Sequence, residues 1–255
     1  MNFLRTKTED HILHVLIDRG KSNAIDIQVV DELIAILDQA EQDAAVEGLI
    51  LSGKEGFFSS GLDLITLYEY DEAQMRNFWT RFMHLLQKIT AFSKPSAAAI
   101  TGHSPAGGCV IAICCDYRLM AEGEYIIGLN EVAVGLVVPE SIFQLYSFWL
   151  GKGAAYRALM EGKLFKPQEA LRVGLIDEVV SFDRIQNAAF RTIKSVTQFE
   201  RKAWSTTKAN FRKPLVEALS ENQSELIEQV LHQWWRPSTR AVMKTIIDNL
   251  TSKKV

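Results

Sequence analysis

The chain has 255 residues, 47% of them apolar, and a formal charge of −3 at pH 7. This length allows one large domain, or one domain with a small appendage, and the apolar content is enough for a substantial core. The balanced charge argues against a broad surface for nucleic acid or anionic membranes, and no apolar run of about 18 residues predicts a transmembrane helix.

The first residues and the cysteines indicate a cellular setting. The stretch MNFLRTKTEDHILHVLI has acidic residues before any long apolar run, unlike a signal or transit peptide. Cys109, Cys114 and Cys115 have neither a metal-ligand spacing nor the even number of a disulfide framework, so we expect buried core thiols in a reducing compartment. The prediction is a cytoplasmic protein, with an organelle matrix as the alternative should a presequence precede this sequence.

Strand and helix patterns alternate along the first 180 residues. A short strand is expected at 11–17, and apolar residues at helical spacing predict a helix at 26–43. Further elements are expected as strands at 48–53, 96–101 and 174–180, a long amphipathic helix at 71–92, and helices near 139–150, 152–161 and 167–173. From 183 onward the pattern is almost wholly helical, with a turn around Pro237.

This βαβ-type alternation followed by a helical tail predicts an α/β fold. The sequence has no internal repeat or flexible linker, so residues 1–200 are expected to form the core and 201–255 a helical C-terminal region of the same domain that takes part in oligomerisation. Trp234 and Trp235 are adjacent and cannot share one narrow helix face, which predicts that one of them meets a neighbouring element or subunit.

The stretch SPAGGCVIAICCDYRLMAEGEYIIGLNE, residues 104–131, carries the first candidate site. Ser104 is expected as a helix N-cap and Pro105 as the first helical residue, which would leave the N–H groups of residues 106–108 free at the positive end of the helix dipole. Glycine at 107 and 108 would let an anionic oxygen approach the backbone closely. The alternative is that these glycines only allow tight packing.

A second glycine-containing segment, EGFFSSGLDL at 55–64, follows the strand expected at 48–53. Ligands often bind at the carboxyl ends of strands in α/β folds. Ser59, Ser60 and Gly61 offer exposed backbone groups, and Asp63 could cap a following turn, although such a loop could also be purely structural. Two donor segments that converge on one oxygen would form an oxyanion hole.

FFSSGLDL and ITGHSPAGGCVIAICCDYRLMAE, together with RALMEGKLFKPQEALRVGLIDEVV, resemble the crotonase superfamily of enoyl-CoA hydratases and isomerases. The resemblance spans roughly residues 10–200. It implies a crotonase-like spiral of ββα turns with a helical C-terminal region. Within the superfamily, PAGGCVIAICCDYRLMA and IIGLNE are most similar to mitochondrial-type Δ3,Δ2-enoyl-CoA isomerases.

The resemblance also assigns roles to residues. It implies that the N–H groups of Leu62 and Gly107 are the oxyanion donors and that Glu131 is the catalytic base. The acyl-CoA thioester and pantetheine would be lined by Ser60, Gly61, Leu62, Asp63, Leu64 and Gly107. The segment KSNAID, residues 21–26, falls where the family contacts the CoA nucleotide, but its usual proline is absent and no residue is assigned there.

Glu131 is also a reasonable base on chemical grounds. It follows the apolar run YIIGLN, and a carboxylate in an apolar pocket has a raised pKa that suits proton transfer near neutral pH. Without the resemblance, it could equally be a surface glutamate after a strand.

A hydratase of this superfamily would have a second glutamate three residues after Gly107. This chain has Val110 there, on the same helix face, which favours isomerisation over hydration. Glu140, after Pro139, could be a second acid, or simply a favourable residue at a helix N-terminus. The histidines, including His103 beside the donor segment, are weaker candidates.

The sequence therefore predicts an enzyme that converts 3-enoyl-CoA to trans-2-enoyl-CoA in fatty acid β-oxidation. It would need no metal or redox cofactor, because CoA arrives with the substrate, and would form a homotrimer or a dimer of trimers, as the resemblance implies. The alternatives are a hydratase or another acyl-CoA enolate enzyme that uses Glu131 and Glu140, or a non-catalytic or RNA-binding relative. No nucleic acid or membrane partner is expected.

Overall fold

The structure is a computed structural model that describes residues 2–220 and 223–252. The strands are β1 (Leu4–Glu9), β2 (Ile12–Ile17), β3 (Gly48–Ser52), β4 (Gly56–Phe57), β5 (Ser96–Ile100), β6 (Gly102–Pro105), β7 (Tyr117–Ala121), β8 (Ile127–Gly128) and β9 (Glu178–Val180). The helices are α1 (Ile27–Gln42), α2 (Leu64–Tyr68), α3 (Glu72–Ala91), α4 (Gly107–Cys114), α5 (Glu140–Leu150), α6 (Lys152–Met160), α7 (Pro167–Arg172), α8 (Ile185–Val196), α9 (Arg201–Ser220), α10 (Gln223–Trp234) and α11 (Pro237–Ser252), with 3₁₀ turns η1 (Val132–Val134) and η2 (Phe182–Arg184).

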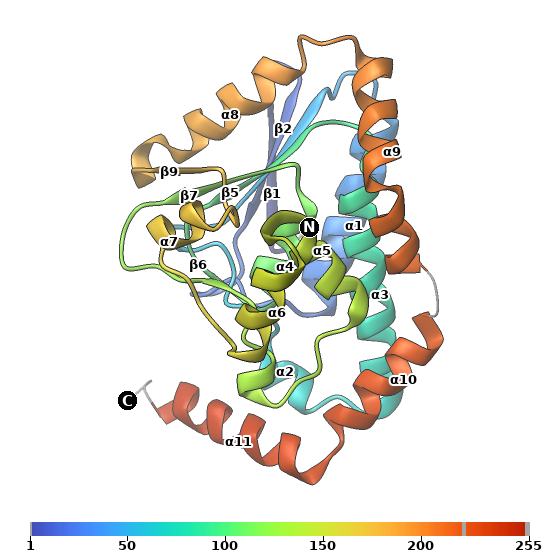
Figure 1. The fold of residues 1–255 in the computed structure, drawn as a ribbon, viewed down its shortest axis with the longest axis vertical. Coiled ribbons are helices and arrows are strands. Elements are labelled where there is room, and N and C mark those ends of the chain that lie inside the picture. Colours follow the sequence, from blue (N-terminus) through green and yellow to red (C-terminus); the bar gives the residue numbers. More distant parts are fainter. Residues whose placement is uncertain (1, 221–222, 253–255) are drawn as a thin grey trace.

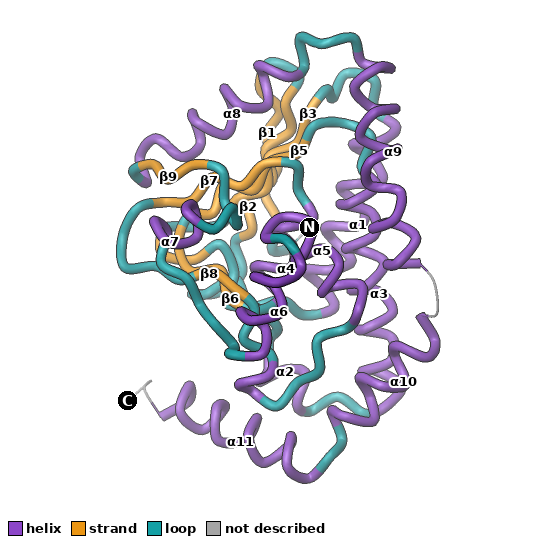
Figure 2. Tube along the Cα trace, viewed as in Figure 1, coloured by secondary structure: helices purple, strands orange, loops and turns teal. Residues whose placement is uncertain are grey.

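The strands form two sheets that the chain visits in turn. The larger sheet has the order β1-β2-β3-β5-β7-β9, with β1 antiparallel to β2 and the other neighbours parallel. The smaller sheet is β4-β6-β8, also parallel. Each of the pairs β3–β4, β5–β6 and β7–β8 therefore gives one strand to each sheet before the chain returns through helices, which is the predicted ββα spiral (Figures 1 and 2).

Successive side chains of a strand point to opposite faces of a sheet, and helices cover both faces of the larger sheet. On β5, Ala97 and Ala99 pack toward α8, whereas Ala98 and Ile100 belong to the main core with α1, α3 and α4. The register places Ala97 beside Ile50 of β3 and Tyr117 of β7. The small residues of β5 thus lie at the centre of the sheet, between two helical layers (Figure 1).

Most predicted elements are confirmed, and their ends shift by one or two residues. The strand predicted at 174–180 is wrong in its first half: Gly174 has φ +79° in the turn after α7, and only Glu178–Val180 pair with β7. Strand β1 was missed because its sequence, LRTKTE, is polar and exposed after Leu4. None of the helices within the described ranges is long and apolar enough to cross a bilayer.

Helix α4 lies at the centre of the main core, and all eight of its residues are buried. Cys109, Cys114 and the following Cys115 are buried free thiols, as predicted. Burial raises the pKa of Cys114 to about 11 and that of Cys115 to about 12. These thiols therefore stay protonated at neutral pH and serve as small core side chains.

The carboxyl end of α4 is satisfied by two buried arginines. Arg212 of α9 donates to the carbonyl oxygens of Cys114 (2.5 Å) and Cys115 (2.9 Å), and Arg118 donates to Cys115 O (3.0 Å). Their charges are balanced by acids, since Asp116 is 3.2 Å from Arg212 and Asp177 is 2.8 Å from Arg118. Cations at a helix C-terminus also interact favourably with the helix dipole.

The C-terminal helices wrap the core, and the last one returns to the loops around β8 and α2. Helix α9 packs on α3 and α5, while α11 packs against α2 and η1 (Figure 1). Trp234 is fully buried, whereas Trp235 is 37% exposed. Trp234 therefore packs within the chain, and the contact of one tryptophan with a neighbouring subunit stays a prediction. The turn expected around Pro237 is observed, directly before α11.

Replacing Arg212 with Met should destabilise the protein by about 3 kcal/mol, because the buried Cys114 carbonyl would lose its charged donor and the Cys115 carbonyl would keep only Arg118. Lys208 would remain at 2.7 Å from Asp116, so that acid would keep a partner. The measurement is urea unfolding at a fixed protein concentration. The matched control is the neighbouring Lys213→Met, whose side chain is 71% exposed and should change stability by less than about 0.5 kcal/mol. Equal losses for both variants would contradict the role of Arg212.

Candidate active site

The two predicted donor segments lie against each other. Gly61 has φ +87°, and a Cβ atom there would lie 3.2 Å from Pro105 O and 3.3 Å from Gly107 N. A Cβ on Gly107 would lie 3.2 Å from Leu62 Cδ2. The loop after β4 and the start of α4 are therefore in contact, although 45 positions separate Leu62 from Gly107 in the sequence.

Two amides in this contact are free. Among the described residues, neither the N–H of Leu62 nor that of Gly107 donates a hydrogen bond. The amides around Leu62 are used: Gly61 N–H donates to Ser59 Oγ (3.1 Å) and Asp63 N–H to Ile25 O (2.8 Å). The free pair is the one that the family resemblance assigned to oxyanion binding, and Gly107 N–H also lies at the positive end of α4.

The predicted start of this helix was wrong. Ser104 and Pro105 belong to β6, where they pair with Ile127 and Gly128 of β8, and α4 begins at Gly107. Ala106 N–H is not free, because it donates to Gly128 O at 2.8 Å. A strand pairing distant in sequence has overridden a local helix-start pattern.

The chain makes a sharp change of direction at Ala106, which has φ +49° although it is not glycine. Such backbone strain is found at functional sites, where the surrounding structure imposes it. Gly108 has a different role from Gly107: a Cβ there would lie only 2.7 Å from Ser59 O, so this glycine permits tight packing. The tight-packing reading of the glycine pair therefore applies to Gly108, and the oxygen-binding reading of Gly107 stays a prediction.

Arg19 and Asn23 brace the donor loop, and sequence reasoning missed both. Arg19 lies 2.7 Å from Asp26 and from Asp63, which are the N-caps of α1 and α2. Asn23 is fully buried with φ +52°, and its side-chain amide donates to the carbonyls of Phe57 and Phe58, both at 3.2 Å. The available signal was that Asn23 lies within the segment 21–26 and Arg19 just before it.

Asp63 caps the turn that was predicted to follow it. Its carboxylate accepts from Thr66 N–H (3.1 Å) and from the Thr66 hydroxyl (2.8 Å). Burial alone would raise the pKa of Asp63, but the two Thr66 bonds and the Arg19 guanidinium hold it below its usual value. Asp63 is thus charged and occupied in the brace, and neighbouring Ser60 donates its N–H to Ser22 O (2.9 Å).

Glu131 lies in the turn after β8, immediately before η1. One carboxylate oxygen, Oε2, is fully enclosed and has no hydrogen-bond partner among the described residues. Burial raises the pKa of Glu131 to about 7. A carboxyl group with this pKa exchanges its proton readily at neutral pH, so it can serve as a base and then as an acid.

Glu131 is close to the amino end of α4. Its charge raises the pKa of Cys109, which lies two residues after Gly107, and burial adds the larger part of that effect. Pro105, just before α4, also pairs with Gly128, three residues before Glu131, so the strands hold these two segments together. The structure thus brings the two free amides and the enclosed carboxylate to one region of the fold.

The remaining candidates occupy different surroundings. Val110 is 1% exposed and lies one turn after Gly107. Glu140 is exposed at the first position of α5, where Gln144 donates to it at 3.3 Å. His103 lies between the rings of Phe57 and Tyr125, and burial lowers its pKa. Only the helix-terminus reading of Glu140 matches this placement. In the described ranges, no group of three or more His, Cys, Asp or Glu side chains could hold a metal ion.

Comparison with known proteins identifies the family. The family model described as enoyl-CoA hydratase/isomerase matches residues 7–244. The chain belongs to this family. The predicted crotonase resemblance is thereby confirmed, as is the prediction of an enzyme of the hydratase/isomerase class. The match includes most of the helical C-terminal region as well as the spiral.

Individual relatives within the family include isomerases and hydratases. The mitochondrial enoyl-CoA delta isomerase 1 of Rattus norvegicus is 34% identical over 234 residues, which are 91% of this chain and 81% of the relative. A short-chain-enoyl-CoA hydratase of Clostridium acetobutylicum is 29% identical over 74% of this chain and 73% of its own. The crystal structure of human mitochondrial Δ3,Δ2-enoyl-CoA isomerase superposes with a TM-score of 0.96 at 28% identity and covers 100% of both chains.

Replacing Glu131 with Gln should stabilise the protein at alkaline pH. Because the folded-state pKa of Glu131 is raised, ionising the carboxyl destabilises the folded state as the pH rises from about 4 to about 7. The variant should therefore match the wild type at pH 4 and exceed its melting temperature at pH 8 by roughly 3 °C or more. Thermal unfolding across this pH range is the measurement. A gain of the same size at pH 4 would show that burial of the charge is not its cause.

Proposed function

We propose that this enzyme is a Δ3,Δ2-enoyl-CoA isomerase that converts 3-enoyl-CoA to trans-2-enoyl-CoA in fatty acid β-oxidation. One observation carries the proposal: a single enclosed carboxylate with a pKa of about 7 lies near two unpartnered amides, and the second carboxylate of a hydratase is replaced by Val110. The similarity to the rat and human isomerases supports the same choice.

The reaction needs only these groups. The thioester carbonyl oxygen accepts from the N–H groups of Leu62 and Gly107, which stabilise the negative charge that develops there. Glu131 removes a proton from C2, and the C2–H electron pair enters a dienolate. Protonated Glu131 then returns the proton to C4, and the double bond moves from C3–C4 to C2–C3.

Substrate binding is proposed for the loop from Ser60 to Leu64, where Leu62 N–H has no partner among the described residues and Arg19 fixes the geometry through Asp63. CoA enters and leaves as part of the thioester, and this mechanism calls on no metal or redox cofactor. The compartment remains a prediction; the rat relative is named as mitochondrial, so an organelle matrix is as reasonable as the cytoplasm. The absence of a nucleic acid partner also remains a prediction.

The decisive assay offers one enzyme preparation both 3-enoyl-CoA and trans-2-enoyl-CoA. The wild type should isomerise the first rapidly and hydrate the second at a far lower rate. Replacing Glu131 with Gln should lower the isomerisation rate by about 10⁴ or more, because general acid–base groups contribute about 10²–10⁴ and this one acts in both proton transfers. Acyl-CoA binding, measured by calorimetry, should be retained.

Two outcomes would overturn this assignment. Hydration faster than isomerisation would make the protein a hydratase, and Glu140→Gln would then test whether that acid takes part. A Glu131→Gln variant within tenfold of the wild-type rate would place the base elsewhere.

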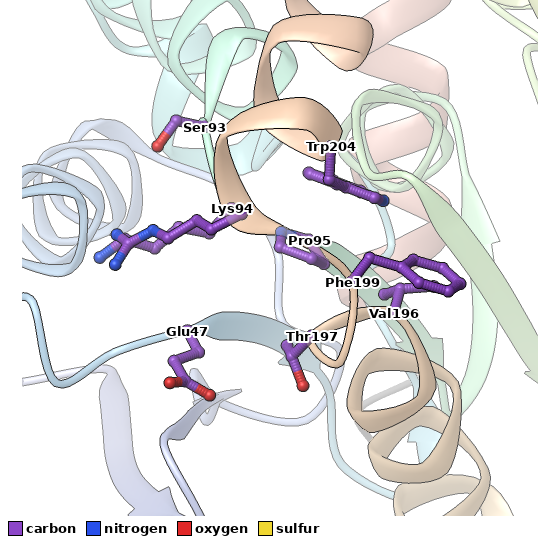
Figure 3. Close-up of a pocket in the computed structure, with 9 residues that line it drawn as sticks. Glu47, Ser93, Lys94, Pro95, Val196, Thr197, Phe199 and Trp204 are labelled. Carbon is purple, nitrogen blue, oxygen red and sulfur yellow. The ribbon is translucent and has the colours of Figure 1, made fainter.

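We also propose that the protein assembles as a homotrimer or a dimer of trimers through the outer face of α9. A groove of about 520 Å³ between α5 and α9 is flanked by exposed aromatic rings, with Phe148 43%, Phe199 61% and Phe211 73% exposed. A smaller adjoining pocket shares Phe199 and Trp204, which lie with Pro95 along one side of it (Figure 3). Exposed aromatic patches of this kind mark association surfaces.

Sedimentation velocity at micromolar concentration tests the assembly. The wild type should sediment as a multiple of three copies of the 28.7 kDa chain. Phe211→Asp should shift the distribution toward monomers, because it places a charge in the apolar patch. Tyr156→Asp is the control, since Tyr156 is 59% exposed on α6 and does not line the groove. A monomeric wild type, or equal dissociation of both variants, would contradict the proposed interface.

A further inference from the structure

The mechanism above leaves one buried polar side chain unused. Tyr146 of α5 is fully buried in the main core. Its hydroxyl group has no hydrogen-bond partner among the described residues. Buried hydroxyl groups are nearly always hydrogen-bonded, so this one calls for a partner in the working enzyme.

The Tyr146 hydroxyl and Glu131 Oε2 are both enclosed atoms without a hydrogen-bond partner among the described residues, and they belong to segments that each pack against the region of α4. The Leu129 N–H, two residues before Glu131, approaches the phenol oxygen, although it falls short of a well-formed hydrogen bond. On α4, the Cys109 thiol is approached by Gly128 N–H. Burial raises the pKa of Tyr146 most, and the charges of Cys109 and Glu131 raise it further, as expected of neighbours. The segment 128–131 is therefore packed against both α4 and α5.

The two oxygens of Glu131 differ in a complementary way. Oε2 is fully enclosed and lacks a donor, whereas Oε1 is not enclosed in this manner and the residue as a whole keeps partial exposure. The hydroxyl of Tyr146 is a donor without an acceptor. Because Leu129 N–H approaches the phenol oxygen on its acceptor side, the hydroxyl proton remains available for Oε2.

We propose that Tyr146 is a positioning residue for Glu131: its hydroxyl donates to Oε2 through one water and leaves Oε1 to carry the proton between C2 and C4. A shuttle that serves two carbons needs one oxygen that moves over the substrate and one that stays anchored. The inference rests on the proposed function, in which Glu131 is the only acid and base.

Other titratable groups around Glu131 offer weaker anchors. Cys109 is the second donor that the carboxylate's charge reaches, but a thiol is a poor hydrogen-bond donor. The side chains that donate to Gly135 O, in the turn after Glu131, are both neutral: Gln233 of α10 and Thr239 of α11. The nearby cation of that helix, Arg240, stacks on Tyr68 instead.

The test is Tyr146→Phe, which keeps the ring and removes the donor. A hydrogen bond to the carboxylate favours its charged form, so its loss should raise the pKa of Glu131 further above 7. The acid limb of kcat/KM should move to higher pH by about one unit, with a roughly tenfold loss at pH 6 and convergence with the wild type near pH 9. The fold should survive, because the hydroxyl makes no other well-formed bond, and thermal unfolding checks this.

Three variants separate the explanations. Tyr117→Phe, which removes a half-buried phenol on β7, should leave the pH profile unchanged. Cys109→Ala should also leave it unchanged, and a shift there with none in Tyr146→Phe would overturn the proposal. A uniform loss at all pH values in Tyr146→Phe would assign Tyr146 a packing role and would likewise overturn it.

A measurement without substrate keeps this inference separable from the isomerase assignment. The infrared carbonyl band of protonated Glu131, identified by its disappearance in Glu131→Gln, can be titrated in the wild type and in Tyr146→Phe. The band should persist to higher pH in Tyr146→Phe. If the wild type fails to isomerise 3-enoyl-CoA, the proposed function fails while this titration still decides whether Tyr146 anchors Glu131; identical titrations in an active enzyme would sink the Tyr146 proposal alone.

Discussion

The constraint on which the site depends is the complete burial of α4. A helix of eight residues has unsatisfied backbone groups at both ends, and inside a core no solvent can satisfy them. At the carboxyl end, Arg212 and Arg118 supply charged donors from distant parts of the chain. At the amino end, Gly107 N–H has no partner among the described residues, which is why it is proposed as a donor to a substrate oxygen.

The position of the second free amide, Leu62 N–H, depends on a separate set of contacts. Leu62 belongs to a loop, and loops rarely hold a hydrogen-bond donor in a fixed direction without support. Here Arg19 forms ion pairs with Asp26 and Asp63, the capping residues of two helices. Asn23 donates hydrogen bonds from the same region to the carbonyls of Phe57 and Phe58. The loop is therefore fixed on both sides of Leu62, and it contacts α4 through Gly61 and Gly107.

The sequence predicted the elements whose signal is local. Helices α1 and α3 were predicted from apolar spacing, and the structure shows Asp26 and Asp71 as their N-caps; the fold class follows from the alternation of strands and helices. Glu131 could be singled out because a lone carboxylate follows an apolar run. The motif resemblance added Leu62, whose role rests on a backbone group that composition cannot reveal.

Interactions across long sequence separations could not be predicted in this way. Ser104 and Pro105 have the local pattern of a helix start, yet they form a strand because β8 is available to pair with them. Arg212 bonds to a carbonyl 98 positions away, and nothing around it in the sequence distinguishes it from Lys213. In the sequence, Tyr146 looks like an ordinary apolar position of α5. Its hydroxyl becomes a candidate hydrogen-bond donor only once the turn at 128–131 is placed in the fold.

The enclosure of Glu131 has opposite effects on stability and on catalysis. Removing water raises the pKa of the carboxyl to about 7, which makes the ionised form less favourable in the folded protein. The same change brings its proton affinity close to the operating pH, where a group that must first take a proton and then release it works best. A second carboxylate nearby would raise that pKa further by like-charge repulsion, so an apolar Val110 on α4 is compatible with a single shuttling acid. In the proposed mechanism one residue therefore supplies both the acid and the base, and its proton affinity is set by burial rather than by a partner acid.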